Sequence, residues 1–403
     1  MSIKVPVIMY HSVGRNNPDW IWNHLITPVN VFEAQIKFLS KRVFNSINLQ
    51  ELYVYMKYNN KISDNPIVLT FDDGYLDNWV YAFPILKKYG MKGTIFVNPE
   101  FVDPIDKCRL NLDDVWNGKC EEKDLFSKGF LSWHEMRKME ESGIIDIQSH
   151  SMSHTWYFTG DEIVDFHHPG NDQFPWLFWN AHPERKSFYL NENQETFVPY
   201  GTPIYKNGRS LGIKRYFEDT GLSRHLTTFV KNQEDDFFTC KDWKNALFQQ
   251  VNIYKSENKL NDRYETDEEQ EERFRYELFK SKALLEDKLN KKIDFLCWAG
   301  GAFNNKALSI ANEAGYLSST LFYNDSERKN SFGDDPSEIN RTGCVSEFNW
   351  HNNFISYTEP RYFMANIKYF CGDKIYLWVI RLYKIKYFAK FIIKKLLKRG
   401  EMR

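Results

Sequence analysis

The sequence predicts an α/β fold built around a parallel sheet or barrel. Short apolar runs that suit buried strands recur along the chain, and segments with apolar residues at three- and four-residue spacing separate them. Two of these helical segments end at a glycine, Gly90 and Gly143. Strands that alternate with helices in this way are typical of parallel sheets, and 403 residues can supply one large α/β domain with additions or two ordinary domains.

The predicted elements follow one another in a regular order. The first strand, KVPVIMYHSV at residues 4–13, places His11 near its C-terminal end. Residues 132–143 form a helix with Ser132 as N-cap and Glu135 at capping-box distance. The remaining elements, by the same criteria, are helices at 30–43 and 48–58, a strand at 67–71, a helix at 78–90, strands at 92–98 and 144–150, a helix at 267–290, a strand at 293–301, a helix at 305–315 and a strand at 316–323.

Two segments depart from this alternation. From about residue 155 to residue 235 the chain is rich in Pro, Gly, Asn and aromatic residues, which predicts a long insertion that covers one face of the domain. Residues 366–403 form a basic tail rich in Leu, Ile, Phe and Tyr. We therefore expect one domain at residues 1–365, interrupted by the insertion, followed by the tail.

The tail leaves two interpretations open. After Asp373 it carries nine basic residues and no acidic residue up to Arg399. One interpretation is a surface helix that packs on the domain through its apolar stripe. The other is a basic amphipathic helix on anionic lipid, where each Lys or Arg adds about 1 kcal/mol.

Composition excludes several classes of function. A net charge of -1 provides no field that would attract nucleic acid, and we expect no nucleic-acid partner. The six cysteines form no CxxC pair, which argues against a disulfide framework or a thiolate zinc site. The N-terminal apolar run is too short for a signal peptide, so we expect a cytoplasmic protein, with the tail placing it on the inner membrane face if it binds lipid.

The strand at residues 67–71 ends on two adjacent carboxylates, Asp72 and Asp73, followed by Gly74. In parallel α/β folds, functional side chains gather at the C-terminal ends of the strands. An isolated DDG sequence would more simply be a turn with Asp72 as an N-cap. A second motif favours a functional role for the two carboxylates over a simple turn.

The segment SHSMSH places His150 and His154 four residues apart, directly after another predicted strand. On a helical turn, two histidines at this spacing point the same way and can share a metal ion. One carboxylate and two imidazoles make a three-ligand catalytic site with room for water. One aspartate can then bind the ion while the other stays free as a general base. This division requires a sharp turn, which Gly74 allows.

The motifs TFDDGY and SHSMSH together resemble the polysaccharide deacetylase family, also called the NodB-homology or carbohydrate esterase family. The resemblance covers most of residues 3–325 apart from the insertion. It implies an irregular (β/α) barrel and a hydrolase that removes an acetyl group from an N-acetylated amino sugar in a glycan or glycan intermediate. It also implies a divalent metal, with zinc first and cobalt, nickel or manganese as other choices.

The resemblance implies a role for each motif residue. Asp72 matches the catalytic base, which activates a metal-bound water as the nucleophile. Asp73, His150 and His154 match the metal ligands. The family's usual C-terminal histidine motif is missing. In a subgroup similar to the poly-N-acetylglucosamine deacetylases, a Tyr-His strand places a histidine in the position of the acid, and MYHSV matches that opening.

We therefore nominate His11 as the general acid, with His351 in reserve; a structural histidine at a strand end is the alternative. A second departure is CWAGGAFN, where the family has Arg-x-Pro-Tyr-Gly or a similar sequence. Gly300 takes the tyrosine position and keeps the backbone N–H that would bind the oxyanion. Cys297 takes the arginine position, so we propose Arg341 as the residue that holds Asp72, a solvated surface arginine being the equal alternative.

The substrate-binding residues are harder to predict. Tyr75 and Trp298 lie within the motifs, and the insertion offers Trp176, Trp179, Tyr200 and Tyr205 as groove walls, although core packing explains these aromatic residues equally well. We expect an acetylated glycan or sugar as substrate, with a nucleotide-linked, lipid-linked or soluble intermediate favoured. The competing functions are an inactive sugar-binding relative and a glycoside hydrolase, for which two adjacent carboxylates are poorly placed.

Overall fold

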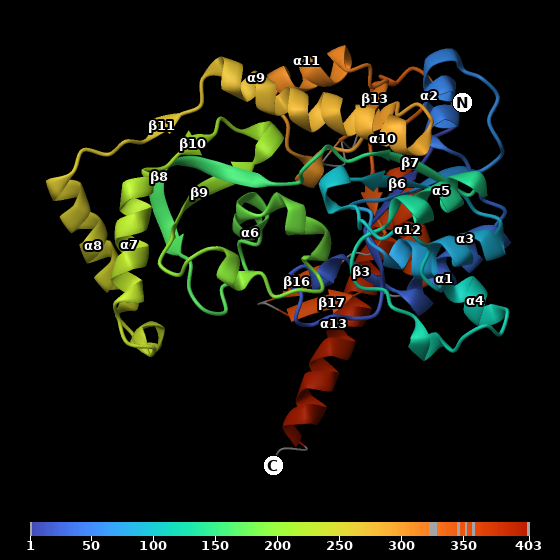
Figure 1. Ribbon diagram of the computed structural model, residues 1–403. Helices are drawn as coiled ribbons and strands as arrows, with labels where there is room; N and C mark the ends of the chain where they lie inside the picture. Colours follow the sequence, from blue (N-terminus) through green and yellow to red (C-terminus); the bar gives the residue numbers. More distant parts are fainter. Residues whose placement is uncertain (1, 322–328, 345–346, 351–352, 357–358, 401–403) are drawn as a thin grey trace.

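A curled, all-parallel sheet forms the centre of the protein. The computed structural model describes residues 2–321, 329–344, 347–350, 353–356 and 359–400. Every neighbouring pair in the sheet is parallel, as the alternation of strands and helices predicted, so the α/β class is confirmed. Figure 1 shows helices packed around this sheet. The strand order is β14 (Glu338–Ile339), β13 (Ser318–Thr320), β12 (Phe295–Leu296), β7 (Ile145–Ser149), β6 (Gly93–Val97), β5 (Pro66–Phe71), β1 (Val7–Tyr10) and β15 (Thr342–Gly343).

The two edge strands of this order are consecutive in the sequence. β14 pairs with β13 at one edge, β15 pairs with β1 at the other, and only Asn340 and Arg341 separate them. Residues 338–343 therefore join both edges and close the sheet into an irregular barrel. The side chain of Asn330 fixes this closing segment by hydrogen bonds to the backbone N–H and carbonyl of Asn340.

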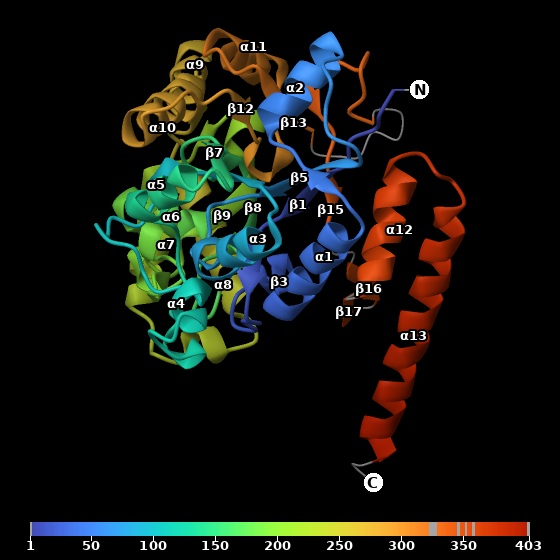
Figure 2. The ribbon, with the colours of Figure 1, turned by 90° about the vertical axis from the view of Figure 1, so that its right-hand side faces the viewer.

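Helices cover the outside of the barrel (Figure 2). Most of their apolar faces share one large buried cluster with the strands, which includes Phe32, Leu69, Met136 and Leu278, whereas the helix at Leu49–Tyr58 packs into a second cluster with Val68 and Phe295. These helices are α1 (Val29–Lys41), α2 (Leu49–Tyr58), α3 (Phe83–Tyr89), α4 (Leu112–Trp116), α5 (Trp133–Glu141), α9 (Asp267–Arg275), α10 (Ser281–Leu289) and α11 (Asn305–Glu313). Single π-helical segments precede α3 at Asn78–Ala82 and join α9 to α10 at Tyr276–Lys280.

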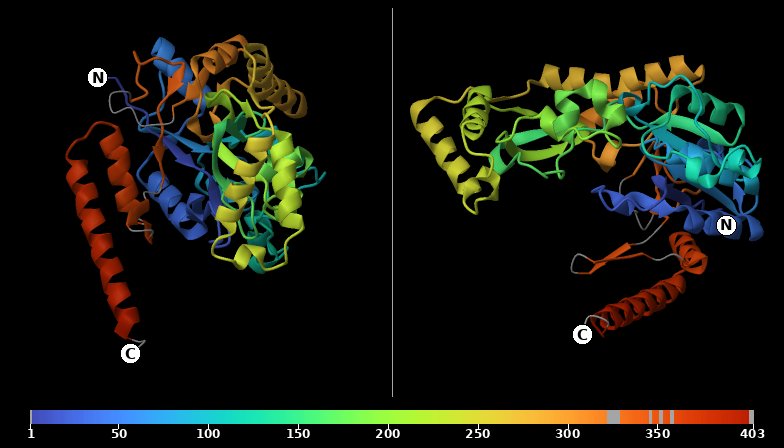
Figure 3. Two further views of the ribbon diagram at one scale, coloured as in Figure 1. Left: turned by 90° about the vertical axis from the view of Figure 1, so that its left-hand side faces the viewer. Right: turned by 60° about the horizontal axis from the view of Figure 1, so that its bottom comes forward.

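A long antiparallel hairpin begins where the strand alternation lapses. Its strands are β8 (Trp156–Phe166) and β9 (Pro203–Arg209). The other appended elements are α6 (Trp176–Ala181), β10 (Tyr216–Phe217), α7 (Thr220–Lys231), α8 (Trp243–Glu257) and β11 (Arg263–Tyr264). These elements extend to one side of the barrel (Figure 3). They also continue past Asp235, the predicted end of the insertion, since α8 and β11 follow that residue and β11 pairs with β10.

The remaining elements lie at the two ends of the chain. β2 (Ser12–Gly14) and β3 (Ile26–Pro28) form a short parallel pair, and β4 (Asn45–Ser46) pairs with β5. A hairpin of β16 (Glu347–Trp350) and β17 (Asn353–Ser356) leads to α12 (Pro360–Phe370) and α13 (Tyr376–Gly400). The division into a domain and a tail stays a prediction.

Candidate metal and catalytic site

The backbone turns sharply where β5 ends. Asp73 and Gly74 have φ angles of 71° and 67°, so the left-handed turn that the glycine predicted begins one residue earlier, at Asp73. Aspartate tolerates this conformation, whereas a Cβ at position 74 would lie 3.1 Å from a methyl carbon of Val97. The turn sends the carboxylates of Asp72 and Asp73 to different partners.

The loop after β7 presents His150 and His154. The ring of His150 donates through Nδ1 to the backbone carbonyl of Cys297 at 2.8 Å, which directs Nε2 toward Asp73. Ser151 and His154 have φ angles of 62° and 44°, so the loop is held in a conformation that these residues rarely adopt. Its backbone needs external support.

Glu277, in the π-helical segment between α9 and α10, supplies that support. Its buried carboxylate accepts hydrogen bonds from the backbone N–H groups of Met152 and Ser153 at 3.1 and 3.0 Å, and from the Ser153 hydroxyl. A further bond comes from the hydroxyl of Ser210, next to β9. The carboxylate thus fixes two of the three residues between the histidines.

The structure brings Asp73, His150 and His154 together. Asp73 Oδ1 lies 3.1 Å from Nε2 of His150 and 3.3 Å from Nε2 of His154. This oxygen is buried and has no hydrogen-bond partner among the described residues. A buried carboxylate oxygen that faces two imidazole nitrogens is a donor set suited to a divalent cation, so these residues fit one.

The electrostatics of two members of the cluster, Asp73 and His154, suit such an ion. Burial raises the pKa of Asp73, but the two histidines outweigh it and hold the pKa well below its usual range. Burial lowers the pKa of His154 to about 4, so this imidazole is neutral at physiological pH, as a metal ligand must be.

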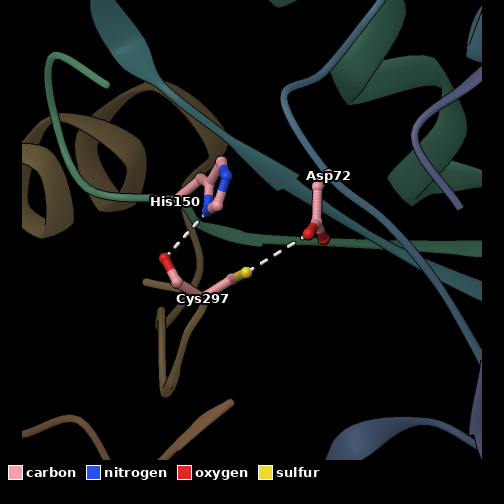
Figure 4. Close-up of side chains that lie close together, drawn as sticks. All are labelled: Asp72, His150 and Cys297. Carbon is pink, nitrogen blue, oxygen red and sulfur yellow. Dashed lines mark hydrogen bonds between the residues drawn. The ribbon is translucent and has the colours of Figure 1, made fainter. Parts of the chain in front are cut away.

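A second group, Asp72, His150 and Cys297, also has ligand atoms close together (Figure 4). Figure 4 shows the Cys297 thiol directed toward Asp72 and its carbonyl directed toward His150. The sulfur lies 3.5 Å from Asp72 Oδ2 and accepts a hydrogen bond from Arg341 at 3.0 Å. Because Asp72 already binds a guanidinium, the group that contains Asp73 is the better candidate for a cation site.

Arg341 reaches Asp72 from the segment that closes the barrel. Its two terminal nitrogens donate to the two carboxylate oxygens at 2.7 and 3.0 Å, and both side chains are buried. Burial raises the pKa of Asp72, but the charges of Arg341, His11 and His150 outweigh burial and hold the pKa below its ordinary value. Asp72 is therefore ionised at neutral pH.

His11 follows β1 and lies beside the same carboxylate. Its Nε2 is 3.9 Å from Asp72 Oδ2, and its side chain is about one-fifth exposed, at 21%. Asn78 holds the backbone here by donating to the His11 carbonyl at 3.1 Å. The reserve candidate, His351, lies outside the described residues.

Gly300 lies at the cavity wall with a φ angle of 58°. A Cβ at this position would clash with the guanidinium Nε of Arg209, which comes from the end of β9. The appended hairpin therefore fills the space in which an aromatic side chain would start. Sequence reasoning missed Arg209, and the paired glycines at 300 and 301, both with positive φ, were the signal for a close approach.

The candidate metal site lies on the wall of a cavity of about 350 Å³. Trp22, Trp156, Trp179 and Tyr189, here called the aromatic wall, lie on one side, and the Trp156 ring is 5.3 Å from the ring of His154. The lining also includes the candidate metal site of Asp73, His150 and His154. The other lining residues include His11, Asp72, Tyr75, Asn98, Phe101, Phe130, Arg209, Trp298, Gly300, Thr320 and Arg341.

Two predicted substrate-binding residues do not line this cavity. Trp176 packs its ring against Phe158 at 5.4 Å in a buried aromatic cluster, and Tyr200 packs against His167 at 5.2 Å. Tyr205 is also core. Of the insertion residues proposed as groove walls, only Trp179 among the described residues lines the cavity, because α6 turns Trp176 toward the hairpin.

Comparisons with known proteins point to one family. Residues 59–198 match the family model described as polysaccharide deacetylase. The candidate polysaccharide deacetylase YxkH of Bacillus subtilis (strain 168) is 32% identical over 151 residues, which are 38% of this chain and 43% of that protein. The poly-beta-1,6-N-acetyl-D-glucosamine N-deacetylase of Staphylococcus aureus (strain MSSA476) is 26% identical over 122 residues, 30% of this chain and 35% of that protein.

These alignments span less than half the length of either relative. Among solved structures, the deacetylase domain of BpsB from Bordetella bronchiseptica aligns with a TM-score of 0.49 at 16% identity, over 85% of this chain and 95% of that chain.

Proposed function

We propose that the chain carries a polysaccharide deacetylase domain and is a metal-dependent hydrolase that removes the acetyl group from an N-acetylated amino sugar. The observation that carries this proposal is the convergence of Asp73, His150 and His154 beside the ionised Asp72, on the wall of one cavity. The name of the Staphylococcus aureus relative supports an N-acetylglucosamine unit as the substrate class.

Zinc is the first choice of ion, because the carboxylate of Asp73 and the imidazoles of His150 and His154 are donors that zinc commonly binds. A divalent cation held by Asp73, His150 and His154 would polarise the acetyl carbonyl and lower the pKa of the attacking water.

Asp72 takes the proton from that water. Its carboxylate has the ionisation state that a base needs, and Arg341 fixes its orientation through two parallel hydrogen bonds. The Cys297 thiol adds a weak contact at 3.5 Å. Rotation of the carboxylate would break all of these contacts, so the base is preorganised.

His11 and Gly300 complete the reaction. The His11 side chain lines the cavity beside Asp72. When the imidazole is protonated, its Nε2–H donates a proton to the departing amine. The Gly300 N–H stabilises the tetrahedral oxyanion. The aromatic wall and Trp298 offer ring faces on which a sugar can stack.

The proposal is tested by acetate release from a panel of N- and O-acetylated mono- and oligosaccharides, with and without a chelator. We expect chelator-sensitive acetate release from N-acetylglucosamine derivatives, with chain length unchanged. The Asp72→Asn variant should retain the cation and lose turnover. New reducing ends would indicate glycoside hydrolysis, and a cation-free chain that releases no acetate would indicate a sugar-binding relative.

A further inference from the structure

Helix α13 has two separate apolar faces. One face packs on α12, where Tyr376, Val379, Ile380, Tyr383 and Tyr387 form a cluster with Tyr362 and Ala365. Figure 2 shows α13 running beside α12 and then past it, away from the barrel. The packed face therefore accounts for the attachment of the helix and leaves its other side toward solvent.

The second face is exposed. Ile375, Trp378, Leu382, Ile385 and Ile393, here called the outer stripe, are exposed by 73%, 65%, 65%, 65% and 57%. Their spacing of three or four residues, with a double step before Ile393, places them on one side of the helix. Large apolar side chains aligned in this way are costly to leave in water and mark a binding surface.

Basic residues flank the outer stripe. At 100° per residue, Arg381 lies along one side of it and Lys386 and Lys390 along the other. The Arg381 guanidinium sits 5.0 Å from the centre of the Trp378 ring. Lys386 pairs with Glu359 at 2.7 Å, the one ion pair of α13 within the part of the chain that the structure describes. No acidic residue occurs between Lys374 and Arg399.

We propose that the outer stripe docks on an anionic lipid surface, with α13 lying in the plane of the headgroups. An apolar stripe between two basic margins has the charge and shape that such a surface binds. A second copy of the chain fits poorly, because pairing two outer stripes would bring the basic margins together without any acidic residue to compensate.

The helix would lie on the bilayer and not cross it. Within the described residues, no helix is long and apolar enough to span a membrane. Insertion to the depth of the acyl boundary buries one face of a helix and leaves the opposite face in water or protein. In α13 that opposite face is the one already packed on α12.

Flotation of the full chain with lipid vesicles tests this inference. We expect binding to vesicles of phosphatidylglycerol and phosphatidylcholine in equal parts, little binding to phosphatidylcholine alone, and release by high salt. Leu382→Gln and Ile385→Gln should each weaken binding about tenfold, because each removes a large inserted side chain. Arg381→Gln should weaken binding to the anionic vesicles specifically.

Matched controls come from α8, where Ile253 and Lys255 are also exposed. Ile253→Gln and Lys255→Gln should bind vesicles like the wild type, and all five variants should keep the wild-type unfolding midpoint. Equal binding to neutral and anionic vesicles, or unchanged binding by Leu382→Gln and Ile385→Gln, would overturn the proposal. Self-association in light scattering that these two substitutions abolish would assign the stripe to a second copy instead.

Discussion

Arg341 binds both carboxylate oxygens of Asp72 from the segment that closes the barrel. Asp72 and Arg341 lie 269 positions apart, and the closing segment is what brings them together. The same residues thus complete the sheet and orient the carboxylate that we propose as the base. The fold and the site depend on each other at this point.

Replacement of Arg341 by Met should slow acetate release by about a hundredfold with little change in bound metal. Without the guanidinium, burial dominates at Asp72 and raises its pKa, so the acidic limb of the pH–rate profile should move to higher pH. Loss of one member of a buried pair also costs about 3–5 kcal/mol. The Arg341→Met/Asp72→Asn double variant should therefore be more stable than Arg341→Met in denaturant unfolding. An unshifted acidic limb would contradict this role.

Glu277→Gln should weaken metal binding by about tenfold or more, since the amide has only one acceptor oxygen for the hydrogen bonds that hold the histidine loop. Ser210→Ala removes one donor to the same carboxylate without touching the loop and serves as the matched control. Metal affinity can be measured by competition with a chromophoric chelator. Equal affinities for Glu277→Gln and Ser210→Ala would show that the loop does not need this carboxylate.

Asp77 should make the protein less stable as the pH rises. Burial raises its pKa to about 7, although hydrogen bonds from Ser12 and the backbone oppose this. Between about pH 4 and pH 7 the folded state keeps a proton that the unfolded state has lost, so stability falls across this interval and the loss is complete above it. Asp77→Asn should flatten this dependence in denaturant unfolding between about pH 5 and pH 8. Parallel curves for the two proteins would refute the assignment.

Gly300 and Arg209 should behave as a coupled pair. Gly300→Ala should reduce acetate release strongly, because its Cβ meets the Arg209 side chain and the backbone has a positive φ. Arg209→Ala in the same chain should restore part of the activity, as the steric conflict is then removed. A double-mutant cycle on kcat/KM measures this coupling. Strictly additive effects would mean that the two residues act independently.

The sequence predicted the elements whose pattern is local. The apolar runs that became β1, β5, β6 and β7 and the capping box of α5 are visible in short stretches of residues. β14 and β15 have two residues each and no periodicity, so the closure of the barrel was not visible. The β8–β9 hairpin contains register shifts that interrupt its alternation, so the sequence pattern predicts an irregular insertion there and not two strands.

The residues of the candidate site also divide into those with a local sequence signal and those without one. Its motif residues follow strand ends, where sequence reasoning is strongest, and Arg341 was nominated on position alone. The aromatic wall, Arg209 and Glu277 come from elements whose contacts are long-range, and nothing in their local sequence distinguishes them from core residues. Trp176 illustrates this limit, since its neighbour Trp179 on the same short helix lines the cavity and Trp176 does not.

The most direct measurement is the number of divalent cations bound per chain in the wild type, Asp73→Ala and Asp72→Asn. Shared ligation by Asp73, His150 and His154 predicts one cation in the wild type and in Asp72→Asn, and none in Asp73→Ala. Retention of a full equivalent by Asp73→Ala would contradict it.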